Sequence, residues 1–321
     1  MRAGIVGYGN VGRALDGLII DREDLELVGV FTRREPSAVK TLGADVYPLS
    51  FLLEKDFDID VLFLGLGSSR DLPELAPSLA ERFNTIDAYD NHARIAEYKS
   101  AMDAASRRGG KISLIAMGWD PGLLSLIRLF SSAFLPHASV NTFWGRGVSQ
   151  GHSEALKRIA GVRRAIQYTV PREDALTLAS LVSHPFTSTE RHRRVCYIVA
   201  EAGREGEITE AIQNMDGYFL GYETEIHFIS DEEFSRYHTA LSHRGRVIAL
   251  GSSGRYREVK HSLFFDLDIG SNPDLTASIM LASARALYKI KEDGGQGAYT
   301  PFDVPPSYFS PFNRENANNY L

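Results

Sequence analysis

Three glycines near the N-terminus have the spacing that binds the pyrophosphate of a dinucleotide. Gly7, Gly9 and Gly12 follow an apolar run, with Asn10 and Val11 between them. The first glycine permits a sharp turn from strand to helix, the second lets the backbone approach the phosphates, and the third lets the helix pack against the strand. Amide groups at the helix N-terminus then bind the anion. Glycine-rich turns of this kind also occur in α/β proteins that bind no nucleotide, so the motif needs a second signal.

The second signal stands at the end of the next predicted strand, about twenty residues further on. The residues there are Thr32, Arg33 and Arg34. An acid at this place would accept the ribose 2′-hydroxyl of NAD and would repel the 2′-phosphate of NADP. Guanidinium groups offer planar, paired donors to phosphate. The corner therefore predicts NADP as the cofactor, and the alternative is a solvated basic turn.

Two acids follow the ends of two predicted strands that we expect to be neighbours. These acids are Asp90 and Asp120. A pair of carboxyl groups can hold a substrate ammonium and, with one pKa raised, pass protons while a C–N bond forms or breaks. The pair therefore indicates an amino-acid substrate. The alternatives are a helix N-cap for Asp120, which precedes Pro121, and a turn for Asp90, which precedes Asn91.

The elements that position these residues alternate short apolar runs with helical patterns through the first 117 residues. This alternation predicts a doubly wound parallel sheet, with strands over residues 3–6, 25–31, 61–66, 85–88 and 111–116. Ligands of such sheets bind beyond the carboxyl ends of the strands. The residues that we expect in the loops there are Gly67, Ser68, Ser69, Asp87, Asp90, Asn91, His92, Gly118, Trp119, Asp120, Pro121 and Gly122.

The pattern changes from about residue 123 onward. A helix through residue 134 precedes strand patterns over residues 141–144, 165–170, 195–200 and 223–228, with helices near 153–158 and 207–214. These elements predict an α+β domain with a mixed or antiparallel sheet, suited to substrate binding and dimerisation. A long helix over residues 272–291 should return to the first domain. We therefore expect a Rossmann-type dinucleotide-binding domain of residues 1–117 plus about 272–321, and a substrate-binding and dimerisation domain of residues 118–271.

Composition excludes several other classes of protein. The 321 residues are 44% hydrophobic and 24% charged, as in ordinary soluble proteins with substantial cores. A net charge of −6 without a long basic tract argues against nucleic acid as a partner and favours a small molecule. No apolar run reaches the ~20 residues of a membrane span, and a strand that begins near Arg2 leaves no room for a signal peptide. We expect no membrane partner, a cytoplasmic location, no metal site, and a core position for the single cysteine, Cys196.

The chain resembles the NADP-dependent meso-diaminopimelate D-dehydrogenase family over nearly its whole length. The resemblance rests on residues 7–12, 32–34, 87–92, 118–122, 143–145, 149–153, 167–169, 215–219 and 272–274. The glycine motif is shared with many families, whereas the strings at 118–122 and 149–153 are far more specific. The resemblance implies an enzyme of lysine and cell-wall precursor synthesis, with a homodimer as its expected assembly.

The activity that the resemblance implies is reversible oxidative deamination of meso-2,6-diaminopimelate at its D-centre. The products would be L-2-amino-6-oxopimelate and ammonia. Asp90 and Asp120 would orient the amine and relay protons, and the sequence does not decide which of them is the base. Two alternatives stay open: a broader D-amino-acid dehydrogenase on the same scaffold, and a catalytically silent NADP-binding sensor.

The resemblance also implies the residues that bind the rest of the substrate. They are Asp87, Trp119, Trp144, Gln150, Gly151, Thr169, Arg194, His243 and Asn272. Among these, Arg194 borders an apolar strand, so it should point inward and grip the distal carboxylate with two parallel bonds. The tryptophans would close the site over the substrate, although packing is the commoner role of a tryptophan near a glycine.

Two departures from the family pattern affect the expected substrate preference and not the reaction type. The family usually has Pro-His-Gly-Gly where this chain has Ser242, His243, Arg244 and Gly245. The bulky Arg244 is expected to reshape that loop. Glu154 stands where relatives commonly have aspartate, and its longer side chain would narrow that side of the pocket.

Overall fold

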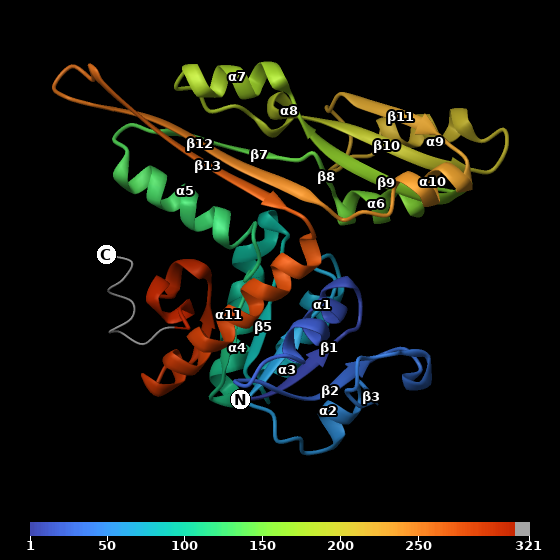
Figure 1. Cartoon of the computed structure of the whole chain (residues 1–321), viewed down its shortest axis with the longest axis vertical. Helices are drawn as coiled ribbons and strands as arrows, with labels where there is room; N and C mark the ends of the chain where they lie inside the picture. The colour runs from blue at the N-terminus through green and yellow to red at the C-terminus, as the bar shows by residue number, and fades with distance from the viewer. Residues whose placement is uncertain (312–321) are drawn as a thin grey trace. The chain divides into compact units, whose positions relative to one another are not determined.

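The computed structural model describes residues 1–311, which fold into two compact units (Figure 1). The first unit contains Met1–Leu126 together with the described residues from Pro273 onward, and the second contains Ile127–Asn272. The first division lies nine residues after the boundary expected at residue 117, because the loop after the sixth strand and the first turn of the next helix stay with the first unit.

The first unit is built on a parallel sheet in the order β14-β6-β5-β4-β1-β2-β3. Its strands are β1 (Arg2–Val6), β2 (Glu26–Thr32), β3 (Val46–Pro48), β4 (Val61–Leu64), β5 (Thr85–Asp87), β6 (Ile112–Leu114) and β14 (Gly297–Tyr299). The prediction of a parallel α/β sheet is confirmed. Two strands, β3 and β14, were not expected, because β3 ends in a proline and β14 begins with a glycine, so neither shows the branched apolar run that marks a strand.

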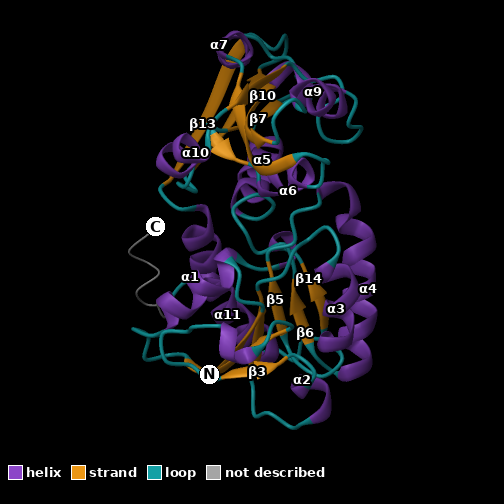
Figure 2. Cartoon of the chain, turned by 90° about the vertical axis from the view of Figure 1, so that its right-hand side faces the viewer, coloured by secondary structure: helices purple, strands orange, loops and turns teal. Residues whose placement is uncertain are grey.

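Helices cover both faces of this sheet. They are α1 (Asn10–Ile19), α2 (Phe51–Glu54), α3 (Asp71–Ala80), α4 (Ile95–Gly109) and α11 (Asn272–Glu292), with the short 3-10 helices η1 (Pro36–Ala38), η2 (His92–Arg94), η3 (Pro301–Asp303) and η4 (Pro306–Phe309). α1 and α11 pack on one face, and α3 and α4 pack on the other (Figure 2). Because both faces are covered, a central strand such as β4 is apolar and buried along its whole length.

The strand order reverses at β1, which lies between β4 and β2. In open parallel sheets such a reversal leaves a crevice at the carboxyl ends of the strands, where nucleotides bind. The loops after β1, β2 and β4 all begin at this edge of the sheet.

The second unit contains two sheets. One is antiparallel, in the order β13-β12-β7, and the other is mixed, in the order β11-β10-β9-β8. The strands are β7 (Ser139–Trp144), β8 (Gly147–Val148), β9 (Val162–Pro171), β10 (His192–Ala200), β11 (Thr224–Phe228), β12 (His243–Ser253) and β13 (Val259–Ile269). The expectation of mixed or antiparallel sheets is confirmed. The long hairpin of β12 and β13 was not predicted, because charged residues interrupt its apolar positions.

The helices of this part of the chain are α5 (Leu123–Phe134), which contains the division between the units, α6 (Gln150–Lys157), α7 (Glu173–Leu181), α8 (Ser188–Arg191), α9 (Glu205–Gln213) and α10 (Asp231–Tyr237). α6 and α9 pack on one face of the mixed sheet, around Leu156, Ile198 and Ile208. Cys196 belongs to this core, where burial raises the pKa of its thiol to about 12. The core position expected for this cysteine is thus observed.

Among the helices of residues 1–311, none has the length and apolar composition that a bilayer span requires.

Candidate active site

The glycine turn between β1 and α1 has the geometry of a phosphate-binding loop. Gly7 adopts a φ of +86°, which an L side chain rarely takes. A Cβ on Gly12 would lie 2.1 Å from the carbonyl oxygen of Gly7, so helix and strand approach closely only because residue 12 is glycine. A Cβ on Gly9 would meet nothing within 4 Å, which leaves open space beside the start of the helix.

The first turn of α1 suits a bound anion. It begins at Asn10 and Val11, its N-cap Gly9 supplies no side-chain hydrogen bond, and no acid lies in the turn. The first amide groups of a helix lack intrahelical partners, and the helix dipole is positive there. These features fit a pyrophosphate and give a negative group no repulsion.

The corner after β2 carries two arginines that are held in different ways. The backbone amide of Arg34 donates to Oγ1 of Thr32 at 3.1 Å, and Nη2 of Arg34 donates to the carbonyl oxygen of Tyr8 at 2.7 Å. Nη2 of Arg33 forms an ion pair of 2.9 Å with Asp71, at the start of α3. Thr32 is buried and no acid occupies its place, so the residues at this corner fit the 2′-phosphate of NADP.

The loops after β4 and β5 are joined by a hydrogen bond. The backbone amide of Asp90 donates to Oγ of Ser68 at 3.1 Å. Gly67 and Ser69 flank this serine and are exposed, as is His92 at the start of η2. The exposed side chain of Asp90 leaves its carboxylate without a hydrogen-bond or ion-pair partner in the described part of the chain.

Asp87 is fully buried at the end of β5. Its Oδ1 accepts hydrogen bonds from the backbone amides of Tyr89 and Ala116 at 2.9 and 3.1 Å, and its Oδ2 accepts one from the hydroxyl of Tyr98 at 2.7 Å. Burial raises the pKa of this carboxyl to about 6. The expectation that Asp87 contacts substrate does not fit this burial, because both of its oxygens bind groups of the protein.

The loop of residues 118–122 closes on itself before α5. A Cβ on Gly122 would lie 1.7 Å from the carbonyl oxygen of Gly118, and its φ of +132° also requires glycine. The amides of Leu123 and Leu124 donate to the carbonyl oxygens of Gly118 and Trp119. α5 begins at Leu123, so Asp120 precedes the cap position by two residues. This geometry disfavours the alternative that Asp120 is an ordinary helix cap.

Asp90 and Asp120 lie at the same edge of the sheet, since β5 and β6 are parallel neighbours. The backbone amide of Met117 donates to the carbonyl oxygen of Asp87 at 2.8 Å. Asp90 comes three residues after Asp87, and Asp120 comes three residues after Met117. Trp119 and Pro121 beside Asp120 are buried, and Asp120 itself is half-buried.

In the second unit, Arg194 and Thr169 lie opposite each other on β10 and β9. Nη1 of Arg194 donates to Oγ1 of Thr169 at 2.7 Å, and its guanidinium lies 4.1 Å from the ring centre of Tyr222. Arg194 is 7% exposed, and burial lowers its pKa. Within residues 1–311 no carboxylate pairs with this guanidinium, and its Nε has no hydrogen-bond partner. A buried cation in this state is suited to bind an anionic ligand.

The start of α6 lies close to Arg194. Nδ1 of His152 shares a hydrogen bond of 2.7 Å with Oγ of Ser149, the N-cap of the helix. Burial and the charge of Arg194 lower the pKa of His152 to about 4, so this imidazole is neutral near pH 7. Gln150 and Gly151, which sequence reasoning placed in the middle of the site, are exposed in the first turn. Sequence reasoning gave His152 no role, although it lies within the family string at 149–153.

Trp144, Thr169 and His243 are brought together through glycines. A Cβ on Gly147 would lie 2.2 Å from the imidazole of His243, and Gly147 pairs with Thr169 in the sheet. A Cβ on Gly145, which follows Trp144, would lie 2.0 Å from the carbonyl oxygen of Thr169. Glycines at these two positions therefore let the strands that carry Trp144, Thr169 and His243 approach one another closely.

His192 supports Trp144, a function that sequence reasoning missed. Its Nε2 accepts a hydrogen bond of 2.9 Å from the backbone amide of Trp144, and the two rings stack with centres 5.1 Å apart. Burial lowers the pKa of His192 to about 3. No pattern in the sequence marks this histidine, because its partner lies 48 residues away.

The structure also places Asn272 and the two residues that depart from the family pattern, Arg244 and Glu154. The backbone amide of Asn272 donates to the carbonyl oxygen of Leu241 at 2.9 Å, beside the start of β12. Arg244 lies within β12 and pairs with Asp268 of β13 at 3.1 Å, so the expected reshaping of a loop is wrong. Glu154 is exposed and pairs with Lys157 on its own helix.

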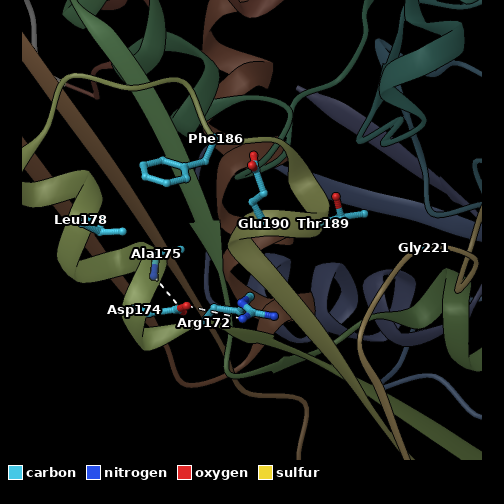
Figure 3. Close-up of a pocket in the computed structure, with 8 residues that line it drawn as sticks. All are labelled: Arg172, Asp174, Ala175, Leu178, Phe186, Thr189, Glu190 and Gly221. Atoms are coloured by element: carbon cyan, nitrogen blue, oxygen red, sulfur yellow. Dashed lines mark hydrogen bonds and ion pairs between the residues drawn. The ribbon is translucent and has the colours of Figure 1, made fainter.

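An open pocket of about 400 Å³ lies elsewhere in the second unit (Figure 3). Its lining residues are Arg172, Asp174, Ala175, Leu178, Phe186, Thr189, Glu190 and Gly221. Arg172 pairs with Glu223 at 2.6 Å and with Asp174 at 3.4 Å, and Oε2 of Glu190 accepts hydrogen bonds from Thr187. Because these charges are satisfied and no predicted site residue lines the pocket, we do not assign the site to it.

The fold, the glycine turn after β1 and the basic corner after β2 define a class of protein. A doubly wound sheet with a phosphate-binding glycine turn and a basic ribose corner is typical of NADP-dependent dehydrogenases. Comparison with known proteins identifies the family within this class. The sequence profile described as "Diaminopimelic acid dehydrogenase C-terminal domain" matches residues 118–271.

Relatives match along the whole chain. A meso-diaminopimelate D-dehydrogenase of Lysinibacillus sphaericus is 45% identical over 97% of this chain and 96% of its own length. The solved structure of Corynebacterium glutamicum diaminopimelate dehydrogenase in complex with diaminopimelate is 40% identical, covers 99% of this chain and 98% of that one, and gives a TM-score of 0.93. An engineered D-amino acid dehydrogenase bound to NADP⁺ is 39% identical, with the same coverage and a TM-score of 0.90. The chain belongs to the diaminopimelate dehydrogenase family.

Proposed function

We propose that the protein is an NADP-dependent meso-diaminopimelate D-dehydrogenase. It catalyses the reversible oxidative deamination of meso-2,6-diaminopimelate at the D-centre, which yields L-2-amino-6-oxopimelate and ammonia. The direction of amination serves the synthesis of lysine and of cell-wall precursors.

The observation that carries this proposal is the buried guanidinium of Arg194. No acid of the described chain neutralises it, and Thr169 and Tyr222 hold it in place. A substrate with a second carboxylate, remote from the reacting carbon, supplies the missing anion. Diaminopimelate has such a carboxylate, whereas a simple D-amino acid has none.

NADP, when bound by the glycine turn and by Thr32, Arg33 and Arg34, supplies the hydride acceptor of the oxidation. The residues of the chain bind and orient the substrate and move protons. Asp90 and Asp120 hold the D-ammonium, and one of them accepts a proton as the C–N bond becomes an imine. The carboxyl that carries this proton then assists the attack of water on the imine carbon and the departure of ammonia.

The distal anchor contributes to the rate as well as to binding. Arg194 and Thr169 hold the L-configured end, so that the reacting carbon is positioned by binding energy from a remote group. His243 and Trp144 complete this part of the site, since Gly147 and Gly145 let their strands approach the strand of Thr169.

The test is NADPH formation with a panel of substrates. We expect activity with meso-diaminopimelate, weak activity with the DD-isomer and none with the LL-isomer. D-alanine and D-lysine complete the panel. Comparable rates on these two amino acids would identify a broader D-amino-acid dehydrogenase, and cofactor binding without turnover would identify a silent sensor.

We also propose that the chain forms a homodimer. β13 lies at an edge of its sheet and exposes Val259 and Phe264, and unpaired apolar edge strands favour association with a second chain. Light scattering coupled to size exclusion should give twice the mass of the chain, and Phe264→Lys should lower it. A monomeric wild type would contradict this proposal.

The cytoplasm is the proposed location, since the reaction uses NADP and the single cysteine of the sequence excludes an internal disulfide. Fractionation of cells should recover the protein with cytoplasmic enzymes. Recovery in a membrane or secreted fraction would overturn this assignment.

A further inference from the structure

Gln167 has a buried carboxamide that the reaction outlined above does not use. Its backbone is fixed, because its amide donates to Oγ of Ser153 at 2.9 Å and its carbonyl oxygen accepts from the amide of Ser149 at 3.0 Å. The side chain is 0% exposed. Nε2 donates to Oγ1 of Thr169 at 3.5 Å, whereas Oε1 has no hydrogen-bond partner within residues 1–311.

The same threonine oxygen joins Gln167 to Arg194. Oγ1 of Thr169 accepts from Nη1 of Arg194 at 2.7 Å, and Nε of Arg194 also lacks a partner in the described chain. One buried acceptor and one buried cationic donor are therefore left unsatisfied on side chains that share a hydroxyl. Buried polar atoms without partners cost free energy, and a ligand that completes their hydrogen bonds recovers it.

We propose that Oε1 of Gln167 accepts a hydrogen bond from the ammonium group at the distal, L-configured end of the substrate, beside the carboxylate held by Arg194. This inference rests on the proposed function and adds a specificity-determining residue to it. The distal end of the substrate carries a carboxylate and an ammonium on one carbon. The carboxylate matches the guanidinium of Arg194 and the ammonium matches Oε1 of Gln167, and the hydroxyl of Thr169 holds both side chains.

A neutral acceptor is the appropriate chemistry at this position. A carboxylate beside Arg194 would form an ion pair with it and would compete with the carboxylate of the substrate. The carboxamide oxygen accepts from an ammonium without neutralising the guanidinium. Other titratable groups near Arg194 include His152, His192 and Cys196. Burial lowers the pKa of His152 to about 4 and that of His192 to about 3, and it raises the pKa of the Cys196 thiol to about 12. All three are therefore neutral near pH 7 and leave the charge of the arginine unchanged.

The test compares two ligands that differ in the distal amine alone. L-2-aminopimelate has the distal amino-acid end and no D-amine, so it does not react, and pimelate lacks both amines. Calorimetry on the NADP⁺ complex gives both dissociation constants for the wild type, for Gln167→Leu and for Gln167→Met, which keeps the length of the side chain. Gln213→Leu, at an exposed site on α9, is the matched control.

We expect both substitutions at residue 167 to raise the dissociation constant of L-2-aminopimelate by about tenfold or more, since a lost hydrogen bond to a charged group has this magnitude. The dissociation constant of pimelate should rise by less than about twofold. The value of kcat/KM for meso-diaminopimelate should fall in parallel. Equal weakening of the two ligands by both variants, or no weakening, would overturn the assignment of Gln167.

Failure of the proposed function gives a different result. A wild type that does not oxidise meso-diaminopimelate refutes the reaction and leaves the binding comparison intact. A wild type that oxidises it, with variants that bind L-2-aminopimelate normally, refutes the role of Gln167 alone.

Discussion

Nη2 of Arg34 donates a hydrogen bond of 2.7 Å to the backbone carbonyl oxygen of Tyr8, which lies between two glycines of the phosphate-binding turn. The corner that should select the cofactor thus also fixes the loop that should hold its pyrophosphate. Arg33 is not tied to that loop, since its partner is Asp71 at the start of α3. The two neighbouring arginines are therefore expected to have separable effects on cofactor binding.

Arg33→Ala should raise the KM for NADP by about tenfold or more, because a charge-assisted contact with phosphate is lost, and should change the KM for NAD little. Arg34→Ala should raise both values, with the larger increase for NADP, since the glycine turn loses a support. Steady-state kinetics with each cofactor measures both effects. The double variant should lose far more with NADP than with NAD, and equal losses would contradict the assignment of this corner.

Asp120→Asn should bind NADP normally and lose about 10²- to 10⁴-fold in turnover. The amide keeps the shape of the side chain and removes its charge and its capacity to take a proton. Fluorescence titration with NADPH measures cofactor binding, and the dependence of kcat on pH should lose one limb if Asp120 is the base. Near-normal turnover would show instead that Asp120 supports the loop of residues 118–122.

Arg194→Met should lower kcat/KM for meso-diaminopimelate by at least about tenfold. Activity on D-amino acids with apolar side chains should stay the same or rise, because these substrates have no distal carboxylate to lose. Since the substitution removes a buried charge that no acid of the described chain neutralises, the midpoint of thermal unfolding should not fall. A parallel loss on both types of substrate would place Arg194 at the reacting end or in a structural role.

Asp87 should make stability depend on pH in a direction unusual for an aspartate. Burial raises the pKa of its carboxyl from 3.8 to about 6, so the folded protein retains a proton that the unfolded chain releases between these values. The stability that this group contributes is complete below about pH 4 and is lost as the pH rises through 6.

Asp87→Asn, which cannot ionise, should therefore gain up to about 3 kcal/mol in free energy of unfolding relative to the wild type between pH 4 and pH 7. Urea unfolding at several pH values measures this difference. Asp274→Asn, at an exposed site in the first turn of α11, is the control. A difference that does not vary with pH would mean that Asp87 is already ionised in the folded state at pH 4.

Local sequence patterns were sufficient to predict the cofactor half of this protein. A glycine turn acts within six residues, and a parallel strand is a short apolar run bounded by turns, so β1, β2, β4, β5 and β6 were all recognisable. The neighbouring positions of β5 and β6 followed from the rules of doubly wound sheets, and with them the shared edge of Asp90 and Asp120. The family resemblance supplied the residues of the distal anchor, which local patterns did not mark.

Tertiary structure decided the state of each side chain. Asp87 ends β5 and Asp90 lies three residues further on, yet the first is fully buried under Tyr98 and the second is exposed, because α4 packs over the first and not over the second. Sequence alone could not separate them. Burial depends on elements far along the chain, and so do the pKa values and hydrogen bonds that follow from it.

The same reason explains why Gln167 and His192 were missed. Gln167 belongs to the family string at 167–169, but no local pattern marks a binding role for it or for His192. Each acquires its significance from partners on other strands, Arg194 for the first and Trp144 for the second. The sequence determined the class of cofactor and the kind of sheet, because both depend on short-range backbone geometry. Which buried atoms remain unsatisfied, and so can bind a ligand, was decided only by the pairing of β9 with β10 and by the helices that cover them.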